Sequence, residues 1–256
     1  MKKNILLLTL ALFVIGCISI LQASNKGANK MNTSNNTDNI IIEDTIIGDD
    51  AIINDDHVIP DEPELDTTTP DSYTVLVNKQ YNLPHGYEPT DLVIPNVLFP
   101  FKEYNQKKNM REVPAHALEE LFNQAENEGV LLYAVSGYRS YERQNGIYNS
   151  NVNNHGQEYT DKYSAKPGHS EHQTGLAMDV SCPDVNFDLV ESFGDTKEGL
   201  WLKNNAHKFG FILRYPKGSK DIVGYNYEPW HIRYVGKDIS MEIHEKNITF
   251  EEYLNK

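Results

Sequence analysis

Residues 170–181 read SEHQTGLAMDVS, and the second half of this stretch alternates between two kinds of side chain. Leu176, Met178 and Val180 would lie on one face of a β-strand, while Asp179 lies on the other face between two small residues. Because an unpaired buried carboxylate is costly, Asp179 needs either solvent or a partner. The alternation therefore predicts a strand with an apolar core face and a second face of small residues around one carboxylate.

A candidate partner for this carboxylate precedes the strand. His172 stands seven residues before Asp179, and Gly175 between them permits a sharp turn that brings the two side chains together. Imidazole and carboxylate groups are common zinc ligands. A hydrogen bond between a structural histidine and an aspartate explains the pair equally well, so both interpretations stay open at this point.

Patterns on both sides of the stretch indicate the fold class. Apolar residues at helical spacing predict helices over 111–129 and 201–209, each closed by a glycine. Short apolar or alternating runs predict strands over 131–135 and 230–235. Because the order lacks the strand–helix–strand repeat of a parallel sheet, we expect an α+β fold, a single domain with a central antiparallel sheet flanked by helices.

The sequence EPWH, residues 228–231, opens the last predicted strand. In a straight strand Glu228 and His231 would face opposite sides, but Pro229 cannot donate to a sheet ladder, so the chain must leave regular strand geometry there. Glu228 can then lie beside His231. Metal-assisted hydrolysis uses a carboxylate in this position, because it accepts a proton from the attacking water. An ordinary surface carboxylate is the alternative interpretation.

An arginine lies in the turn predicted after the strand over 131–135. Arg139 directly precedes Ser140, which can cap the following helix. Its guanidinium group can offer two parallel donors to a carbonyl oxygen or a carboxylate. A surface salt bridge is the alternative interpretation.

The N-terminus has the composition of a targeting segment. Two lysines precede an apolar run over 5–21, so residues 1–23 are interpreted as an export leader or a membrane anchor. The sequence VIGC ends at Cys17 and resembles a lipoprotein cleavage box, in which Cys17 becomes the lipidated first residue. An uncleaved anchor and cleavage after Ala23 stay open. Each interpretation makes the remainder extracytoplasmic, and the first two tether it to the membrane.

Negative charge is concentrated in the segment that follows. The 256-residue chain has 37 acidic against 23 basic residues and a formal charge of −14. Residues 24–72 hold 12 of the acids, 2 lysines and no Phe, Trp or Tyr, so self-repulsion favours an unfolded linker. Residues 73–256 form the remaining domain, for which we expect a monomer. The acidic balance argues against a nucleic-acid partner.

Three motifs together resemble one known family. Residues 170–179 are similar to the S-x-H-x-x-G-x-A-x-D motif of the zinc D-alanyl-D-alanine carboxypeptidases, the bacterial cell-wall family of vancomycin-resistance-type D,D- and L,D-carboxypeptidases. Residues 228–231 match its second motif, and residues 136–140 with Gln144 match its upstream arginine block. The resemblance covers essentially all of residues 73–256.

This resemblance implies a metal centre and its catalytic groups. His172, Asp179 and His231 would hold one Zn²⁺ per chain, with water as the fourth ligand. Glu228 would be the general base and then the general acid for the leaving amine. Arg139 would polarise the scissile carbonyl and stabilise the oxyanion of the tetrahedral intermediate.

The resemblance also implies a substrate. Ser170 and Gln144 would hold its terminal carboxylate, and Trp230 would form a wall of the site. The substrate is expected to be a peptidoglycan stem peptide, from which the enzyme removes the terminal D-alanine. Two alternatives stay open: an L,D-carboxypeptidase that acts on the tetrapeptide stem, and a non-catalytic wall-binding module that keeps the fold and its zinc.

Overall fold

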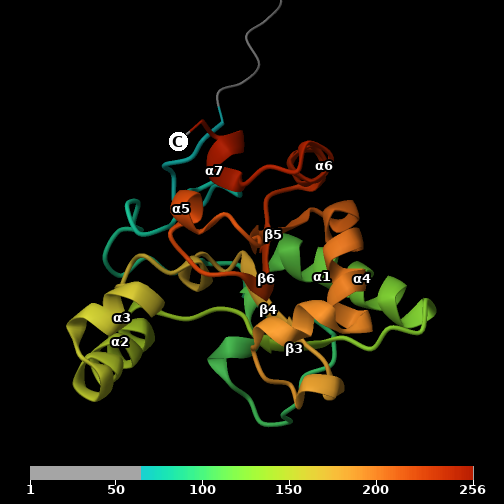
Figure 1. Ribbon diagram of the computed structural model, residues 1–256, viewed down its shortest axis with the longest axis horizontal. Coiled ribbons are helices and arrows are strands. Elements are labelled where there is room, and N and C mark those ends of the chain that lie inside the picture. The colour runs from blue at the N-terminus through green and yellow to red at the C-terminus, as the bar shows by residue number, and fades with distance from the viewer. Residues whose placement is uncertain (1–64, 256) are drawn as a thin grey trace, which may run out of the picture. The chain divides into compact units, whose positions relative to one another are not determined.

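The computed structural model of the protein describes residues 65–255 (Figure 1). Its elements in chain order are β1 (Leu92–Val93), η1 (Gln106–Lys108), β2 (Met110–Arg111), α1 (Glu112–Asn127), β3 (Tyr133–Ser136), α2 (Tyr141–His155), α3 (Gln157–Tyr163), η2 (Glu171–Thr174), β4 (Ala177–Ser181), η3 (Pro183–Val185), η4 (Glu191–Asp195), α4 (Lys197–Asn205), η5 (Ala206–Phe209), β5 (Phe211–Tyr215), α5 (Lys220–Val223), β6 (Glu228–Tyr234), α6 (Lys237–Lys246) and α7 (Phe250–Tyr253). The predicted leader with Cys17 and most of the predicted linker lie outside the described residues. Within 65–255, no helix is both long and apolar enough to cross a lipid bilayer.

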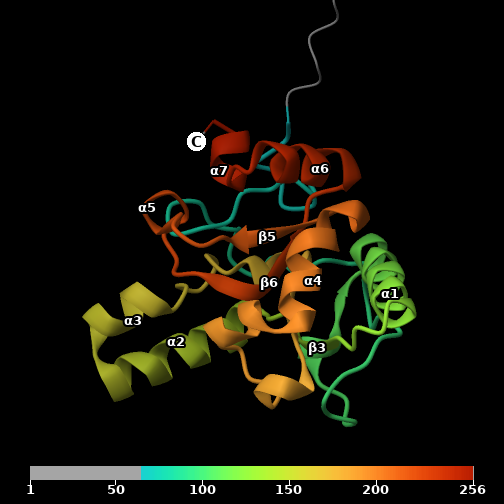
Figure 2. The ribbon, with the colours of Figure 1, turned by 45° about the vertical axis from the view of Figure 1, so that its right-hand side comes forward.

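The four longer strands form one central sheet. Their order is β3-β4-β6-β5, and every neighbouring pair is antiparallel. Figure 2 shows helices on several sides of this sheet, with α6 and α7 above β5, α1 and α4 to the right, and α2 with α3 to the lower left. The predicted α+β fold with a central antiparallel sheet flanked by helices is therefore confirmed.

The core lies between α1 and one face of β4. Leu118 and Leu121 of α1 are fully buried in one apolar cluster with Met178 and Val180 of β4. Each such side chain contributes about 2 kcal/mol to folding through its removal from water. The helix predicted over 111–129 and the apolar face predicted for the strand are thus both confirmed.

The opposite face of β4 is buried as well. Ala177 and Ser181 have no exposed surface, and Asp179 is 3% exposed. Ser181 donates its hydroxyl hydrogen to the carbonyl oxygen of Asp188 over 2.9 Å. Bulk solvent therefore does not hydrate the Asp179 carboxylate, which must be satisfied by groups within the site.

Strand β6 departs from regular pairing where the proline predicts it. Leu213 of β5 pairs with Ile232, but Tyr215 pairs with Glu228, so two additional residues of β6 bulge out between these pairs. Pro229 lies inside the bulge and has no N–H to donate to the ladder. The bulge removes the strict alternation that would place Glu228 and His231 on opposite faces.

The domain begins before residue 73. The backbone N–H of Leu76 donates to the carbonyl of Thr67 over 3.0 Å, and Thr74 donates its hydroxyl to the carbonyl of Asp66 over 2.7 Å. Arg111 donates to the carbonyl of Asp71 over 2.6 Å. The C-terminal end of the predicted unfolded linker is therefore part of the folded domain. Composition alone marks this end as an acidic segment, but its backbone carbonyls accept hydrogen bonds from the domain.

Candidate functional site

Three side chains from three different elements converge at the centre of the sheet. His172 comes from η2, and Asp179 and His231 are direct cross-strand partners on β4 and β6. Nε2 of His172 lies 3.4 Å from Oδ2 of Asp179, and Nδ1 of His231 lies 3.0 Å from Oδ1. One donor atom from each residue falls within 4.8 Å of the other two, and all three residues are buried. The cluster has the size and the donor types of a three-ligand metal site.

The turn that brings His172 to Asp179 depends on Gly175. This residue closes η2 with a φ of +68°, in the left-handed region that favours glycine. A Cβ atom on it would lie 2.8 Å from Cγ of Arg111. The glycine-permitted turn expected from sequence is therefore present, and it has both a conformational and a steric reason.

Each histidine directs one nitrogen at Asp179 and pairs its other nitrogen with a second protein acceptor. Nδ1 of His172 lies 2.8 Å from the carbonyl oxygen of Gly137, and Nε2 of His231 lies 3.2 Å from Oε2 of Glu171. An acceptor in each of these positions favours the tautomer that carries its proton there, and the other nitrogen of each ring then faces Asp179. A ligating histidine typically uses its second nitrogen in this way. The arrangement thus fits a divalent cation and goes beyond a simple pair of histidine and aspartate.

Glu171 was missed by sequence reasoning. Its side chain has no exposed surface, and its Oε1 accepts from Arg214 over 2.7 Å and from Arg233 over 2.8 Å. Arg214 also donates to both carboxylate oxygens of Glu251 in α7, over 2.6 and 2.8 Å. A chain of buried charges therefore connects His231 to the C-terminal helix. The one available signal was the position of Glu171 inside the motif, directly before His172.

Burial and neighbouring charges shift the pKa values in this centre. Burial and the neighbouring Arg139 lower the pKa of His172 to about 3, against the opposing effect of Asp179. For His231, burial is outweighed by hydrogen bonds to Asp179 and Glu171, which raise its pKa to about 9. Arg214 and Arg233 keep the pKa of Glu171 below its ordinary value despite its burial. Carboxylates that favour a proton on His231 also favour a metal cation beside it.

Glu228 lies beside the cluster with its side chain partly open to solvent. Its Oε2 is 4.0 Å from Nδ1 of His231, and its side chain is 26% exposed. Burial raises the pKa of Glu228 to about 7, and the nearby carboxylate of Asp179 adds to the shift. The two residues thus lie side by side, as the proline predicts. A carboxyl group with a pKa near neutrality can both accept and return a proton.

Arg139 reaches the site from the turn after β3. Its backbone N–H donates to the carbonyl of His172 over 3.1 Å. Gly137 precedes it at a point of close approach, where a Cβ atom would lie 2.4 Å from the carbonyl oxygen of Asn109. Arg139 forms no salt bridge with any carboxylate in residues 65–255, so the surface salt bridge is not observed. Its guanidinium group donates to Gln144 and Ser136 and lines the cavity, where it can also serve a ligand.

Gln144 lines the cavity and contacts Arg139. Its side chain is 1% exposed, its Oε1 accepts from Arg139 over 2.9 Å, and its amide donates to the carbonyl of Ala165 over 2.6 Å. Both ends of the amide are therefore occupied. In this position Gln144 orients the guanidinium group of Arg139, which lines the same cavity.

A single cavity of about 280 Å³ brings the predicted residues together. Ser170 is 4% exposed, and its hydroxyl makes no hydrogen bond to another residue of the described chain. Trp230 is half-buried and also packs on the core. All eight residues to which the sequence assigned a role within the domain line this cavity: Arg139, Gln144, Ser170, His172, Asp179, Glu228, Trp230 and His231.

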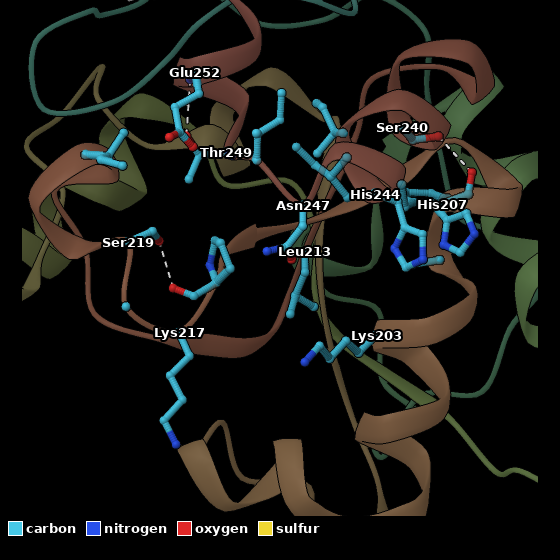
Figure 3. A pocket seen from close by; sticks show the side chains of 18 residues that line it. Lys203, His207, Leu213, Lys217, Ser219, Ser240, His244, Asn247, Thr249 and Glu252 are labelled. Atoms are coloured by element: carbon cyan, nitrogen blue, oxygen red, sulfur yellow. Dashed lines mark hydrogen bonds between the residues drawn. The ribbon is translucent and has the colours of Figure 1, made fainter.

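A second cavity of about 280 Å³ lies between β5, α6 and the segment that leads into α7 (Figure 3). The rings of His207 and His244 stack at its edge with centroids 3.5 Å apart. Sequence reasoning assigned no ligand role to either histidine, and none of the predicted site residues lines this cavity. The candidate chemistry therefore belongs to the cavity around His172 and His231.

Comparisons with known proteins identify the family of the chain. Residues 107–237 match the VanY family model, described as D-alanyl-D-alanine carboxypeptidase. The putative carboxypeptidase YodJ of Bacillus subtilis (strain 168) is 51% identical over 187 residues, which span 73% of this chain and 68% of that protein.

Two solved structures are also similar. The LdcB LD-carboxypeptidase has a TM-score of 0.72 and 51% sequence identity, over 73% of this chain and 87% of that one. A variant of the vancomycin-resistance D,D-pentapeptidase VanY, in complex with Zn(II), has a TM-score of 0.57 and 31% identity, over 71% of this chain and 98% of that one. Both identities are high enough to compare chemistry as well as fold.

Proposed function

The chain belongs to the VanY family of D-alanyl-D-alanine carboxypeptidases, and from this premise we propose that it removes the terminal D-alanine from peptidoglycan stem peptides with the help of one zinc ion. One observation carries the proposal. His172 and His231 each have one nitrogen occupied by an acceptor, and the other nitrogen of each ring faces the carboxylate of Asp179. This preorganised donor set fits Zn²⁺.

The metal would supply one part of the chemistry. Zn²⁺ held by these three side chains lowers the pKa of a bound water towards neutrality. Glu228, 4.0 Å from His231, accepts the proton of the attacking water and delivers it to the amine of the released D-alanine. Arg139 donates hydrogen bonds to the carbonyl oxygen as negative charge develops on it.

The remaining residues would orient the substrate. The free hydroxyl of the buried Ser170 can donate to the terminal carboxylate of the stem peptide, and Trp230 forms part of the cavity wall. Gln144 holds the guanidinium group of Arg139 in place and is assigned to positioning. The carboxylate-binding role that the resemblance implies for Gln144 stays a prediction, since this residue also lines the cavity.

Two bonds in the stem fit this mechanism. The family description names the D-alanyl-D-alanine bond, which in the stem is the terminal bond of the pentapeptide. An L,D-carboxypeptidase that acts on the tetrapeptide is the second candidate, and one observation favours it: LdcB, an LD-carboxypeptidase, has 51% identity and a TM-score of 0.72, against 31% and 0.57 for the D,D-pentapeptidase.

The leader interpretation extends the proposal to location. A lipidated Cys17 or an uncleaved anchor over 1–23 would hold the domain on the outer side of the cell membrane. The acidic linker would then let the domain reach the wall beside it. The domain is proposed to act as a monomer.

The test uses defined stem peptides and mass spectrometry. The purified protein should release D-alanine from a stem peptide, lose this activity after treatment with a zinc chelator, and regain it when Zn²⁺ is returned. Loss of one residue from the pentapeptide identifies the D,D-activity, and loss from the tetrapeptide identifies the L,D-activity. Full turnover by metal-free protein would contradict the mechanism, and binding of wall fragments without any cleavage would favour the non-catalytic module.

A further inference from the structure

Helices α2 and α3 form an arm at the lower left of Figure 2. An exposed row of aromatic rings runs along this arm. His155 ends α2, and Tyr159 and Tyr163 lie in α3. Ring centroids are 5.0 Å apart between His155 and Tyr159, and 4.6 Å apart between Tyr159 and Tyr163. Tyr159 and Tyr163 are 50% and 48% exposed. The row is therefore a continuous aromatic surface in contact with solvent.

The arm is held together by a different set of contacts. Thr160 is 1% exposed, and its hydroxyl donates to the carbonyl of Gly156 over 2.9 Å. Tyr148 of α2 donates its hydroxyl to Asp161 of α3 and accepts from the amide of Gln157. These contacts join the two helices without the outer rings. Packing of the arm therefore does not explain why the aromatic row exists.

The row begins at the candidate active site. Tyr163 lines the same cavity as Glu228 and His231, and Tyr159 is its neighbour along the arm. The ammonium group of Lys162 lies 5.2 Å from the centroid of the Tyr163 ring and adds a hydrogen-bond donor beside it. A ligand that leaves the cavity along the arm thus meets aromatic faces next to a cationic donor.

We propose that Tyr159 and Tyr163 form a carbohydrate-binding subsite for the sugar rings of the glycan strand that carries the stem peptide. This inference rests on the proposed function, in which the D-alanine end of the stem occupies the cavity around His231. The sugar is attached to the opposite end of the stem peptide. When the D-alanine end occupies the cavity, the sugar therefore lies away from the metal ligands. A pyranose ring has apolar C–H groups on its faces and hydroxyl groups around its edge. This polarity matches an aromatic ring with a polar neighbour.

The first experiment compares two substrates in the full-length zinc-loaded protein. Tyr159→Ala should lower kcat/KM for stem peptides linked to glycan by about three- to tenfold, through KM, as expected for the loss of one stacked ring. For the free stem peptide, the same substitution should lower kcat/KM by less than about twofold. Tyr159→Phe keeps the ring face and should restore the parent value. Equal losses on both substrates, or no loss on either, would overturn the inference.

The matched control is Tyr104→Ala, which removes an exposed tyrosine outside the arm (74% exposed). This substitution should leave kcat/KM unchanged for both substrates. The second experiment does not depend on catalysis. Binding of a peptide-free glycan oligosaccharide is measured by calorimetry for the parent, Tyr159→Ala and Tyr104→Ala. Binding by the parent and Tyr104→Ala that weakens in Tyr159→Ala supports the subsite even if no stem peptide is cleaved. Absence of binding by the parent overturns the subsite even if the proposed hydrolysis is observed.

Discussion

Replacing Glu171 by glutamine should weaken zinc binding through the tautomer of His231. The carboxylate now accepts from Arg214 and Arg233 with Oε1 and from Nε2 of His231 with Oε2. In Glu171→Gln one of these positions becomes an NH₂ donor. If the amide oxygen stays with the two arginines, the NH₂ group meets the N–H of His231, and relief of that clash moves the histidine proton to Nδ1. Nδ1 is the nitrogen that faces Asp179, so the metal would lose a ligand.

Two magnitudes follow from this geometry. Loss of an acceptor that orients a metal-ligating histidine lowers metal affinity by about 10- to 100-fold. The same change removes the negative charge that Glu171 places beside two fully buried arginines. Loss of this charge lowers the free energy of unfolding by about 3–5 kcal/mol. The second effect could unfold part of the sample and imitate the first, so the two quantities need separate measurements.

Glu251→Gln is the matched control. Glu251 is 3% exposed and accepts from Arg214 and Asn78, but it does not touch His231. It should lose a similar amount of stability and keep the zinc affinity of the parent within about threefold, since no partner of a metal ligand is removed.

The assay measures zinc affinity by competition with a chromophoric chelator, at a temperature at which circular dichroism shows both variants to be folded. Urea denaturation of the metal-free proteins gives the stability of each. Parent zinc affinity in folded Glu171→Gln would refute the argument from the histidine tautomer. An equal loss of zinc affinity in Glu251→Gln would show that the effect comes from general loosening of the buried charges.

Further predictions address other parts of the site. Glu228→Gln should keep zinc within about threefold of the parent while kcat falls by about 10²- to 10⁴-fold, and loss of metal in this variant would reassign Glu228 as a ligand. Arg139→Ala should lower kcat by about 10²- to 10³-fold, so unchanged turnover of stem peptides would remove it from the mechanism. Gly137→Ala places a Cβ atom 2.4 Å from the carbonyl oxygen of Asn109 and should lower the free energy of unfolding by about 1–3 kcal/mol, as thermal denaturation would show. Cys17→Ser should release the protein from the membrane fraction if lipidation anchors it, whereas unchanged fractionation would favour the uncleaved anchor.

Local patterns were sufficient for several features. The alternation over 175–181 predicted β4 and its core face, and Gly175 predicted the turn that returns His172 to Asp179. Pro229 predicted the departure of β6 from strand geometry. Each of these depends on backbone conformation or side-chain period within a few residues, which is information that a single sequence contains.

Other features had no local signal. Gln144 matched the upstream arginine block, but nothing in that motif indicated that its amide accepts from Arg139 and donates to the carbonyl of Ala165. Residues 66–71 had the composition of a linker, yet their backbone carbonyls accept hydrogen bonds from Arg111 and Thr74. Hydrogen-bond partners at such separations are set by packing, which composition does not report.

The residue types and their order by themselves determined the class of the fold and offered His172 and Asp179 as a possible metal pair, because strand period, glycine turns and the types of metal-ligating side chain are local properties. The full ligand set with His231 followed from the resemblance. Only the tertiary structure decided which nitrogen of each histidine faces Asp179 and which carboxylate holds His231 in place. Those outcomes depend on Gly137, 35 residues from His172, and on Glu171, 60 residues from His231. The physical reason is that a buried polar group takes its partner from whatever the fold places within hydrogen-bond distance.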